Sequence, residues 1–320
     1  MTISRRVALL TTLAGAAAAQ PAWPERPVRI IVPFPGGSTP DTAARVLVPH
    51  FTEVFGQPFI VENRAGAGGN IGTEAVARAT DGHTLGVSIN GPLATAPTLF
   101  PNLGYSPERD IAPISLLART GQVLAVHPAM PARTFEEFVA YARGNPGRIS
   151  FGSVGAGSGG HLAMADLMAR TGIEMVHVPY RGFPQAVVDL IAGRIQAMVI
   201  IVSGILPQLR EGLARPLAVT AAQRVSQLPD VPTLVESGLA GADSYAWIGL
   251  IGPAIMPAER VARLSAEARR ALGAPEARTR METAGFQVTA STAPEFRAFI
   301  TQEAERWGGL IRRQGIVPES

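Results

Sequence analysis

Two residue types are absent from this chain, and each absence excludes classes of chemistry. Its 320 residues contain no cysteine, so neither a disulfide framework nor thiolate catalysis is available. All 28 basic residues are arginine, because no lysine occurs anywhere in the sequence. Schiff-base and pyridoxal chemistry need a lysine amine, and a phosphate-binding P-loop needs the lysine that follows its last glycine. These absences exclude the chain from all of these classes.

Charge is scarce as well, and its distribution gives no reason to expect a nucleic-acid partner. Charged residues make up 17% of the chain and hydrophobic residues 47%, which is enough apolar material for a large core in about two domains. The formal net charge is +3, and two of those positive charges, Arg5 and Arg6, lie in a segment that we expect to be removed. Because no run of basic residues interleaved with aromatic residues occurs, we predict no nucleic-acid binding.

Long apolar runs are absent apart from one short run at the N-terminus. Residues 1–19, MTISRRVALLTTLAGAAAA, combine two arginines, an apolar stretch and small residues before Gln20. The stretch is shorter than the ~20 apolar residues that span a bilayer, so it predicts a cleaved secretory signal rather than an anchor. We expect cleavage after Ala19 and export from the cytoplasm, and Ser4-Arg5-Arg6 leaves general and twin-arginine export both open.

The rest of the chain predicts two α/β modules. Strands and helices alternate, which is typical of parallel strands joined by helical crossovers. The first module is expected to have strands over 28–34, 59–62 and 84–89 and helices over about 40–55 and 71–79. We predict Thr39 as the N-cap of its first helix. The pattern restarts after His127, with Thr134 and Glu137 spaced as a capping box, and the chain ends with helices over 258–272 and about 294–313.

Each module contains a strand that runs through glycines into a helix. The stretches are VPFPGGSTPDTAAR at 32–45 and GSVGAGSGG at 152–160. Free backbone N–H groups and the positive end of the helix dipole meet at such a point, which makes it a ready anion site. Hydrogen bonds to a carboxylate contribute about 1.5–3 kcal/mol each, so a few of them can bind an acid without a basic side chain. One glycine loop could simply be a tight turn, but two in equivalent places favour binding.

Two other interpretations of the second loop need weighing. GAGSGG at 155–160 satisfies the G-x-G-x-x-G pattern of dinucleotide sites, but the next predicted strand ends at Tyr180 without the acidic residue that binds ribose. Ser158 resembles the serine of a nucleophile elbow, but for a triad in the order Ser, acid, His only His177 follows an acidic residue, Asp166. We favour the alternative in which Ser158 is an N-cap and His161 belongs to the first helical turn. An exported serine hydrolase that uses Ser158 is the second hypothesis.

The histidines give no reason to expect a metal. The five residues, His50, His83, His127, His161 and His177, show no spacing such as H-x-H or H-E-x-x-H. We therefore predict no metal site. Because the dinucleotide site and the serine nucleophile are the less favoured interpretations of the second loop, we also predict no cofactor and no catalytic residue.

Several longer stretches resemble one family. They are WPERPVRIIVPF, ENRAGAGGNIG, SFGSVGAGSGGHLAMADL, HVPYRG and LAVTAAQRVSQLPDVPTLVESG. In this order, over nearly the whole mature chain, they resemble the Bug-type solute-binding proteins of tripartite tricarboxylate transporters. The resemblance implies a type II periplasmic-binding-protein fold, with two α/β domains, a ligand cleft and two hinge crossings. It also implies a periplasmic, monomeric, non-enzymatic receptor that passes a small carboxylate to membrane carrier subunits.

The resemblance also implies domain boundaries and a binding site. Domain 1 should comprise 20–120 and 247–320, and domain 2 should comprise 121–246, with the hinge through about 116–126 and 245–252. The residues implied to bind the ligand come from three loops and two strand ends: Phe34, Gly37, Ser38, Thr39, Asp41, Gly69, Asn70, Asn90, Ser153, Gly157, Ser158, His161 and Tyr180. Whether Asp41 and Arg181 touch the ligand stays open.

Departures from the family pattern bear on the ligand. Ser38, Thr39 and Pro40 separate the glycine pair from Asp41, where two residues are expected. Gln196 and Ile200 stand in a strand where an aspartate is frequent, and Ala96 stands where we expect asparagine. These three changes predict a less polar cleft and a mono- or dicarboxylate with an apolar or aromatic body. A sensor role beside a two-component system, in place of transport, is a further alternative.

Overall fold

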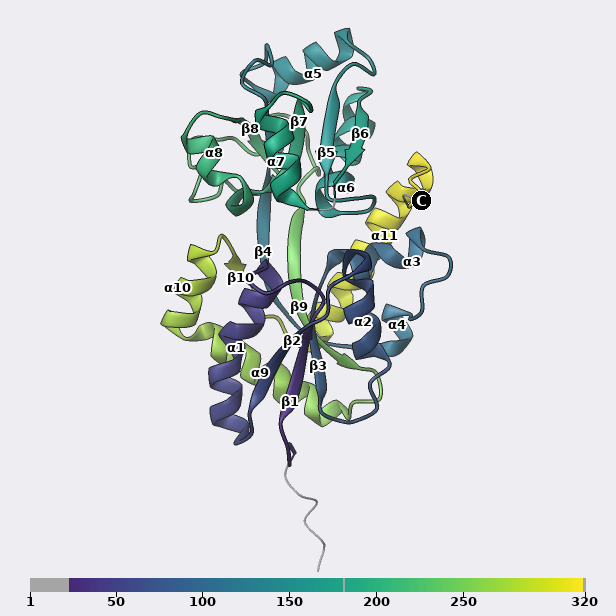
Figure 1. Ribbon diagram of the computed structural model, residues 1–320, viewed down its shortest axis with the longest axis vertical. Coiled ribbons are helices and arrows are strands. Elements are labelled where there is room, and N and C mark those ends of the chain that lie inside the picture. The colour runs from purple at the N-terminus through teal and green to yellow at the C-terminus, as the bar shows by residue number, and fades with distance from the viewer. Residues whose placement is uncertain (1–22, 181, 319–320) are drawn as a thin grey trace, which may run out of the picture.

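The computed structural model describes residues 23–180 and 182–318, which form two lobes stacked along the long axis of the molecule (Figure 1). Both lobes combine strands with surrounding helices, as expected for the two-domain α/β fold predicted from the sequence. The predicted signal at 1–19 and residue Arg181 lie outside the described residues.

The first lobe, drawn below in Figure 1, contains β1 (Val28–Val32), α1 (Thr39–Phe55), β2 (Phe59–Asn63), η1 (Ala67–Gly69), α2 (Asn70–Ala77), β3 (Thr84–Ile89), η2 (Gly91–Thr95), α3 (Ala96–Leu99), α4 (Pro107–Asp110), α9 (Ala258–Gly273), α10 (Pro275–Thr283) and β10 (Gln287–Val288). The second lobe contains α5 (Phe135–Gly144), β5 (Ser150–Ser153), α6 (Gly159–Thr171), β6 (Val176–Pro179), α7 (Phe183–Ile191), β7 (Ala197–Ile201), η3 (Val202–Gly204), α8 (Leu206–Arg210) and β8 (Arg215–Val219). Strand β4 (Ile111–Val126) runs through the waist between the lobes, and β9 (Tyr245–Pro253) lies beside it.

The directions of the strands locate the candidate site. Strands β1, β2 and β3 are parallel, and β9 is antiparallel to both β3 and β4, so β3 and β4 run the same way. In the second lobe β7 is antiparallel to β4, and β5 and β6 are parallel to β7. The strands of the two lobes therefore run toward each other, and their carboxyl ends meet at the waist. Ligands of α/β proteins bind at this end of the strands.

Each lobe buries apolar side chains on both faces of its strands. Along β1, Ile30 belongs to one apolar cluster and Ile31 to another, as the period of a strand requires. Along β4, Val123 and Leu124 divide in the same way between the two clusters of the second lobe. These strands are buried on both sides, which explains why their sequences read as continuous apolar runs.

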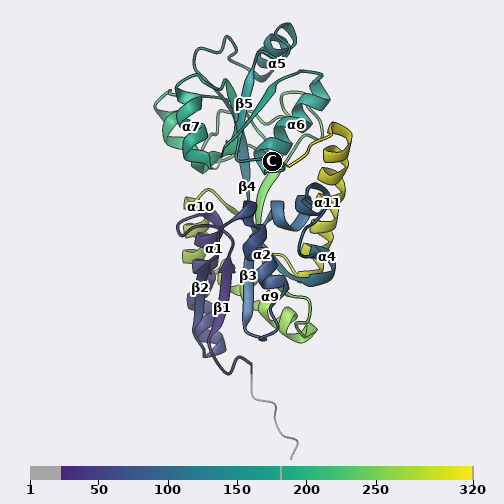
Figure 2. The ribbon, with the colours of Figure 1, turned by 45° about the vertical axis from the view of Figure 1, so that its right-hand side comes forward.

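Helix α11 (Ala293–Gln314) connects the two lobes along one side of the molecule (Figure 2). Its residues Trp307 and Leu310 share one buried cluster with Leu99 of the first lobe and Leu162 of the second. On the same helix, Glu303 Oε2 accepts the indole N–H groups of Trp247, at 2.9 Å, and of Trp307, also at 2.9 Å. The sequence predicted this helix, but not that it reaches the second lobe.

Local details correct several predictions. The N-cap of α1 is Ser38 and not Thr39, which is the first helical residue. Thr134 accepts the N–H of Glu137 as predicted, but the Glu137 carboxylate accepts from the N–H of Arg133, so the capping box is incomplete. A complete capping box begins α11 instead. Helix α10 and strand β10 were not predicted from the sequence.

Candidate ligand-binding site

The N-terminus of α1 lies at the waist, where the carboxyl ends of the strands meet. Gly37 has a φ of 79°, a conformation that favours glycine, and it turns the chain from β1 into the helix. Ser38, the N-cap, makes no capping bond with its side chain, and its buried Oγ has no hydrogen-bond partner among the described residues. A buried hydroxyl without a partner is costly, so its position favours contact with a ligand.

The carboxylate of Asp41 holds this loop from within. It is 2% exposed, and it accepts the N–H of Gly37 at 2.9 Å, the side-chain amide of Asn63 at 2.9 Å and the guanidinium of Arg45 at 2.8 Å. Burial alone would raise the pKa of Asp41, but the hydrogen bonds from these three partners outweigh it and lower the pKa to about 2. The charge is therefore retained and neutralised inside the loop.

The second glycine loop ends at the N-terminus of α6. Gly155 and Gly157 have φ values of 106° and 74°, which let the chain turn sharply after β5. Ser158 Oγ accepts the N–H of His161 at 3.4 Å and is the N-cap of α6, as predicted. The N–H groups of Gly159 and Gly160 have no acceptor among the described residues, so they stay available, as the first N–H groups of a helix do.

A stack of three rings supports this loop. The rings of His161 and His177 lie 4.0 Å apart and nearly parallel, and Phe151 stacks on His177 at 5.0 Å. His161 Nδ1 accepts the N–H of Gly157 at 3.1 Å, so that ring carries its proton on Nε2 when it is neutral. Burial, and then the neighbouring His177, lower the pKa of His161 to about 4. His161 is thus a buried support of the loop, and more than a polar residue of the first turn.

The geometry for serine catalysis is not formed at Ser158. Its hydroxyl accepts a backbone N–H, and the ring of His161 faces Gly157. Ser153, and not Ser158, forms a hydrogen bond with a histidine side chain: its Oγ lies 2.6 Å from His177 Nε2. Ser153 is 1% exposed and also exchanges hydrogen bonds with Gly155, so it is buried beneath the loop.

A third loop completes the first-lobe side. The ring of Phe34 and Pro92 approach Gly69 so closely that a Cβ there would lie 3.0 Å from each. Gly69 has a φ of 98°, and the side-chain oxygen of Asn70 accepts the hydroxyl of Tyr105 at 2.9 Å. Phe34 and Pro92 thus bring apolar surface beside the loops that carry the polar groups.

Residues of both lobes and of the crossing strand converge at Gly159. A Cβ on Gly159 would lie 3.4 Å from Asn90 Nδ2, at the end of β3, and 3.5 Å from Gln122 Oε1, in β4. Nearby, the hydroxyl of Thr95 donates to the carbonyl of Gly157 at 3.3 Å, directly across the two lobes. Gln122 was not predicted as a site residue, although a glutamine inside the apolar strand ISLLARTGQVLAV is a signal that could have identified it.

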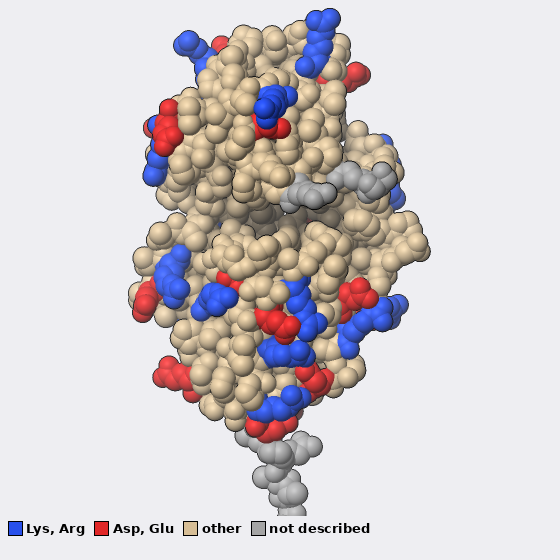
Figure 3. All heavy atoms as spheres, in the orientation of Figure 1, with Lys and Arg blue, Asp and Glu red and all other residues tan. Residues whose placement is uncertain are grey.

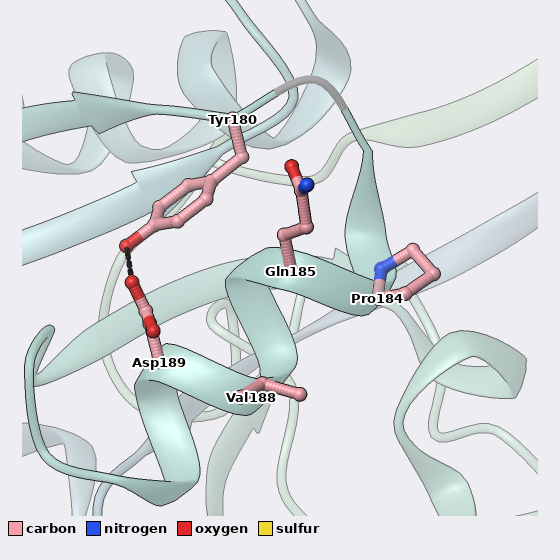
Figure 4. A pocket seen from close by; sticks show the side chains of 5 residues that line it. All are labelled: Tyr180, Pro184, Gln185, Val188 and Asp189. Carbon is pink, nitrogen blue, oxygen red and sulfur yellow. Dashed lines mark hydrogen bonds between the residues drawn. The ribbon is translucent and has the colours of Figure 1, made fainter.

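Tyr180 follows the carboxyl end of β6, where its N–H donates to the Ser153 carbonyl at 2.8 Å, whereas Gln196 lies away from the waist. The hydroxyl of Tyr180 donates to Asp189 at 2.9 Å, in a surface pocket of the second lobe (Figure 4). Burial and the neighbouring Asp189 carboxylate raise the pKa of Tyr180 to about 12. Its ring, however, packs beside Gly152 in β5. Gln196 lies before the amino end of β7, away from the waist, and its side chain accepts the N–H of Ser150. The expectation that Gln196 affects the polarity of the cleft is therefore wrong.

On the face shown in Figure 3, the described residues at the waist carry little charge. Figure 3 shows a hollow between the lobes, bordered in that view mainly by residues that are neither acidic nor basic. Among residues 23–180 and 182–318, no three acidic or histidine side chains are grouped so that they could hold a metal ion. In the same part of the chain, no helix has the length and apolar character needed to cross a bilayer.

Known proteins resemble this chain over nearly its whole length. The model of the tripartite tricarboxylate transporter family receptor matches residues 43–316. The UPF0065 protein in the tcbD-tcbE intergenic region of Pseudomonas sp. (strain P51) is 39% identical over 305 residues, which are 94% of this chain and 90% of that protein. The structure of R. palustris Rpa4515 with adipate superposes with a TM-score of 0.83 at 31% identity, and covers 93% of this chain and 100% of its own. MatC (Rpa3494) from Rhodopseudomonas palustris with bound malate gives a TM-score of 0.79 at 32% identity, and covers 90% of this chain and 100% of its own.

Proposed function

Because the chain belongs to the receptors of the tripartite tricarboxylate transporter family, we propose that it captures a small carboxylate between its lobes and delivers it to a membrane carrier of that type. Members of this family are periplasmic solute-binding proteins and not enzymes. For this chain we propose a periplasmic location after removal of residues 1–19, action as a monomer and no catalysis.

The observation that carries the proposal is the pair of helix N-termini at the waist. Helices α1 and α6 both begin where the strands of the two lobes run toward each other, and both offer backbone N–H groups. Ser38 adds a buried hydroxyl that has no partner among the residues that the structure describes. An acid bound there would accept several charge-assisted hydrogen bonds and gain from both helix dipoles, without a basic side chain in contact.

Two facing anion sites suit an acid with a carboxylate for each lobe. The similar structures hold adipate and malate, both dicarboxylates. The ring of Phe34 beside the first loop gives an apolar surface for the part of the ligand between its charged groups. We propose a mono- or dicarboxylate with an apolar or aromatic body as the ligand class, bound by the loops at 34–41, 68–70 and 153–161.

Closure around the ligand would require the lobes to move as two bodies. We propose that residues 20–120 with 247–320 form one body, that residues 121–246 form the other, and that the chain bends at 116–126 and 245–252. Strand β4 supports this division, because its partner changes from β9 to β7 and β8 between Gly121 and Gln122.

Thermal unfolding of the mature protein with a panel of acids tests the proposal. A ligand that binds only the folded state stabilises it by about 2.7 kcal/mol at a hundredfold excess over its Kd, which raises the Tm. We expect such a rise with at least one of adipate, malate, succinate, benzoate and phenylacetate. Adipamide, which has the skeleton of adipate without charge, is the matched control and should give none. If no acid raises the Tm at millimolar concentration, the proposed function is wrong.

A further inference from the structure

Gln122 is a buried polar residue in the strand that joins the two lobes. It lies in β4 at the point where that strand passes from the first lobe to the second, and it is 2% exposed. Its main chain is held by Thr220, whose hydroxyl accepts the Gln122 N–H at 3.1 Å and whose N–H donates to the Gln122 carbonyl at 2.8 Å. Its side-chain Oε1, in contrast, has no hydrogen-bond partner among the described residues.

The amide of Gln122 is directed at the free end of α6. A Cβ on Gly159 would lie 3.5 Å from Oε1 and 3.6 Å from Nε2, and a Cβ on Gly160 would lie 3.7 Å from Nε2. These are the two glycines whose N–H groups have no acceptor among residues 23–180 and 182–318. Asn90 Nδ2 approaches the same point from the first lobe. Two backbone N–H groups that can donate to a carboxylate thus lie beside a side-chain amide that can both donate and accept.

We infer that Gln122 is a specificity-determining residue that selects carboxylates with a hydroxyl group beside the carboxylate, an inference that rests on the proposed function. The carboxylate accepts the N–H groups at the start of α6, and the neighbouring hydroxyl donates to the Gln122 amide. A hydroxyl both donates and accepts, so it satisfies the amide in either orientation of that group. An acid without the hydroxyl leaves a buried amide oxygen unpaired.

The charges near the site favour a hydroxyl over an ammonium group. An ammonium ion buried at this point would require an anionic partner. Asp41 is the acidic residue of the first glycine loop, and its carboxylate already accepts from Gly37, Arg45 and Asn63. A neutral donor needs only the amide of Gln122, so 2-hydroxy acids fit the site better than 2-amino acids.

Three matched pairs of acids test this inference by titration calorimetry of the full mature protein at pH 7. The pairs are succinate with malate, adipate with 2-hydroxyadipate, and phenylacetate with mandelate. In at least one pair, we expect the hydroxy acid to bind the wild-type protein roughly 10- to 100-fold more tightly than its partner. Aspartate, the amino counterpart of malate, should bind more weakly than malate.

Two variants link the preference to Gln122. Gln122→Met keeps the length of the side chain without its amide, and Gln122→Ala removes the amide and leaves space; both should bind the two acids of a pair within about threefold. Gln196→Met is the matched control, because Gln196 binds only main-chain groups at the far end of β7, and it should retain the preference. Circular dichroism confirms that each variant is folded, and either folded Gln122 variant suffices for the comparison.

The outcomes separate the two proposals. If acids bind but the wild-type protein does not prefer the hydroxy acid in any pair, or binds none of the three hydroxy acids, the inference is overturned and the proposed function stands. If the preference persists in the Gln122 variants, the residue is structural and the inference is wrong. If no acid binds at all, the proposed function fails, and the inference fails with it.

Discussion

At the scale of single residues, Asp41 shows how a carboxylate can support the anion site that we propose. Its charge is directed at Gly37, Arg45 and Asn63, so it shapes the first glycine loop from the inside. The sequence identified Asp41 as a residue of the first helical turn, but only the contacts show which way its side chain turns.

Replacement of Asp41 with asparagine should lower the free energy of unfolding by about 2 kcal/mol, because a buried amide loses the ion pair with Arg45. Urea denaturation at pH 7 measures the loss, and Asp230→Asn, at an exposed position, is the control. The pKa of Asp41 is about 2 in the folded protein against an ordinary value of 3.8. Its contribution is present above pH 3.8 and is lost as the pH falls toward 2, so wild type and variant should converge there. A variant as stable as the control at pH 7 would contradict this role.

His161 should make the stability of the protein fall at mildly acidic pH. Its pKa is lowered from 6.5 to about 4, so the unfolded chain binds the proton more tightly than the folded protein does. The stabilisation is complete above pH 6.5 and declines as the pH falls toward 4, by up to about 3 kcal/mol. His161→Asn offers an amide oxygen to the N–H of Gly157 and does not titrate. Urea unfolding between pH 7.5 and pH 4 should therefore show a shallower decline in this variant, and parallel curves would refute the assignment.

At the scale of elements, the second glycine loop fits against α3 with no room for a side chain. Gly157 has a φ of 74°, and a Cβ there would lie 2.0 Å from Leu99 Cδ1 in the other lobe. The loop must therefore approach the first lobe as bare backbone. This approach is also the place where Thr95 donates to the Gly157 carbonyl.

Gly157→Ala should weaken ligand binding by about tenfold, because the methyl group strains the backbone and forces the loop away from α3. Addition of Leu99→Ala removes the clash but not the strain, so the double variant should recover part of the affinity. Calorimetry with the best ligand of the thermal panel measures both. Gly273→Ala, at a glycine with nothing within 4 Å of an added Cβ, is the control. A double variant no better than the single one would show that Leu99 is not the obstacle.

Elements with clear local sequence patterns were mostly predicted, whereas elements with weak local patterns or that depend on contacts with distant residues were missed. The first helix, predicted over about 40–55, is found at Thr39–Phe55, because its apolar spacing and its caps are local properties of the chain. Helix α10 was missed because its sequence PEARTRMET is mostly polar and buries only Met281. The two residues of β10 become a strand only through pairing with β4, far away in the sequence.

At the scale of the whole molecule, the site depends on contacts that periodicity cannot reveal. The glycine loops could be found from their composition, and the facing of the two lobes was implied by the family resemblance. The stack of His161 on His177 and the approach of both Asn90 and Gln122 to Gly159 arise from the order of strands in the sheet. That order is set by long-range pairing, so a single sequence does not contain it in readable form.

Helix α11 should contribute to the stability of both lobes together. Leu310→Ala removes buried packing in the cluster that includes Leu99 and Leu162, and should lower the free energy of unfolding by about 2–4 kcal/mol. Urea denaturation followed by circular dichroism measures the change. Gln302→Ala, at an exposed position of the same helix, should change it by less than about 0.5 kcal/mol. Equal effects of the two substitutions would show that the cluster does not stabilise the protein.

The carboxylate of Glu303 has a practical consequence for observing this protein at work. It binds the indoles of two of the three tryptophans of the chain, Trp247 beside the crossing strand and Trp307 against the second lobe. Indole fluorescence responds to hydrogen bonding and to polarity, so separation of the lobes would change the emission of the unlabelled protein. The opening and closing that we propose can thus be timed by stopped-flow mixing with no dye attached.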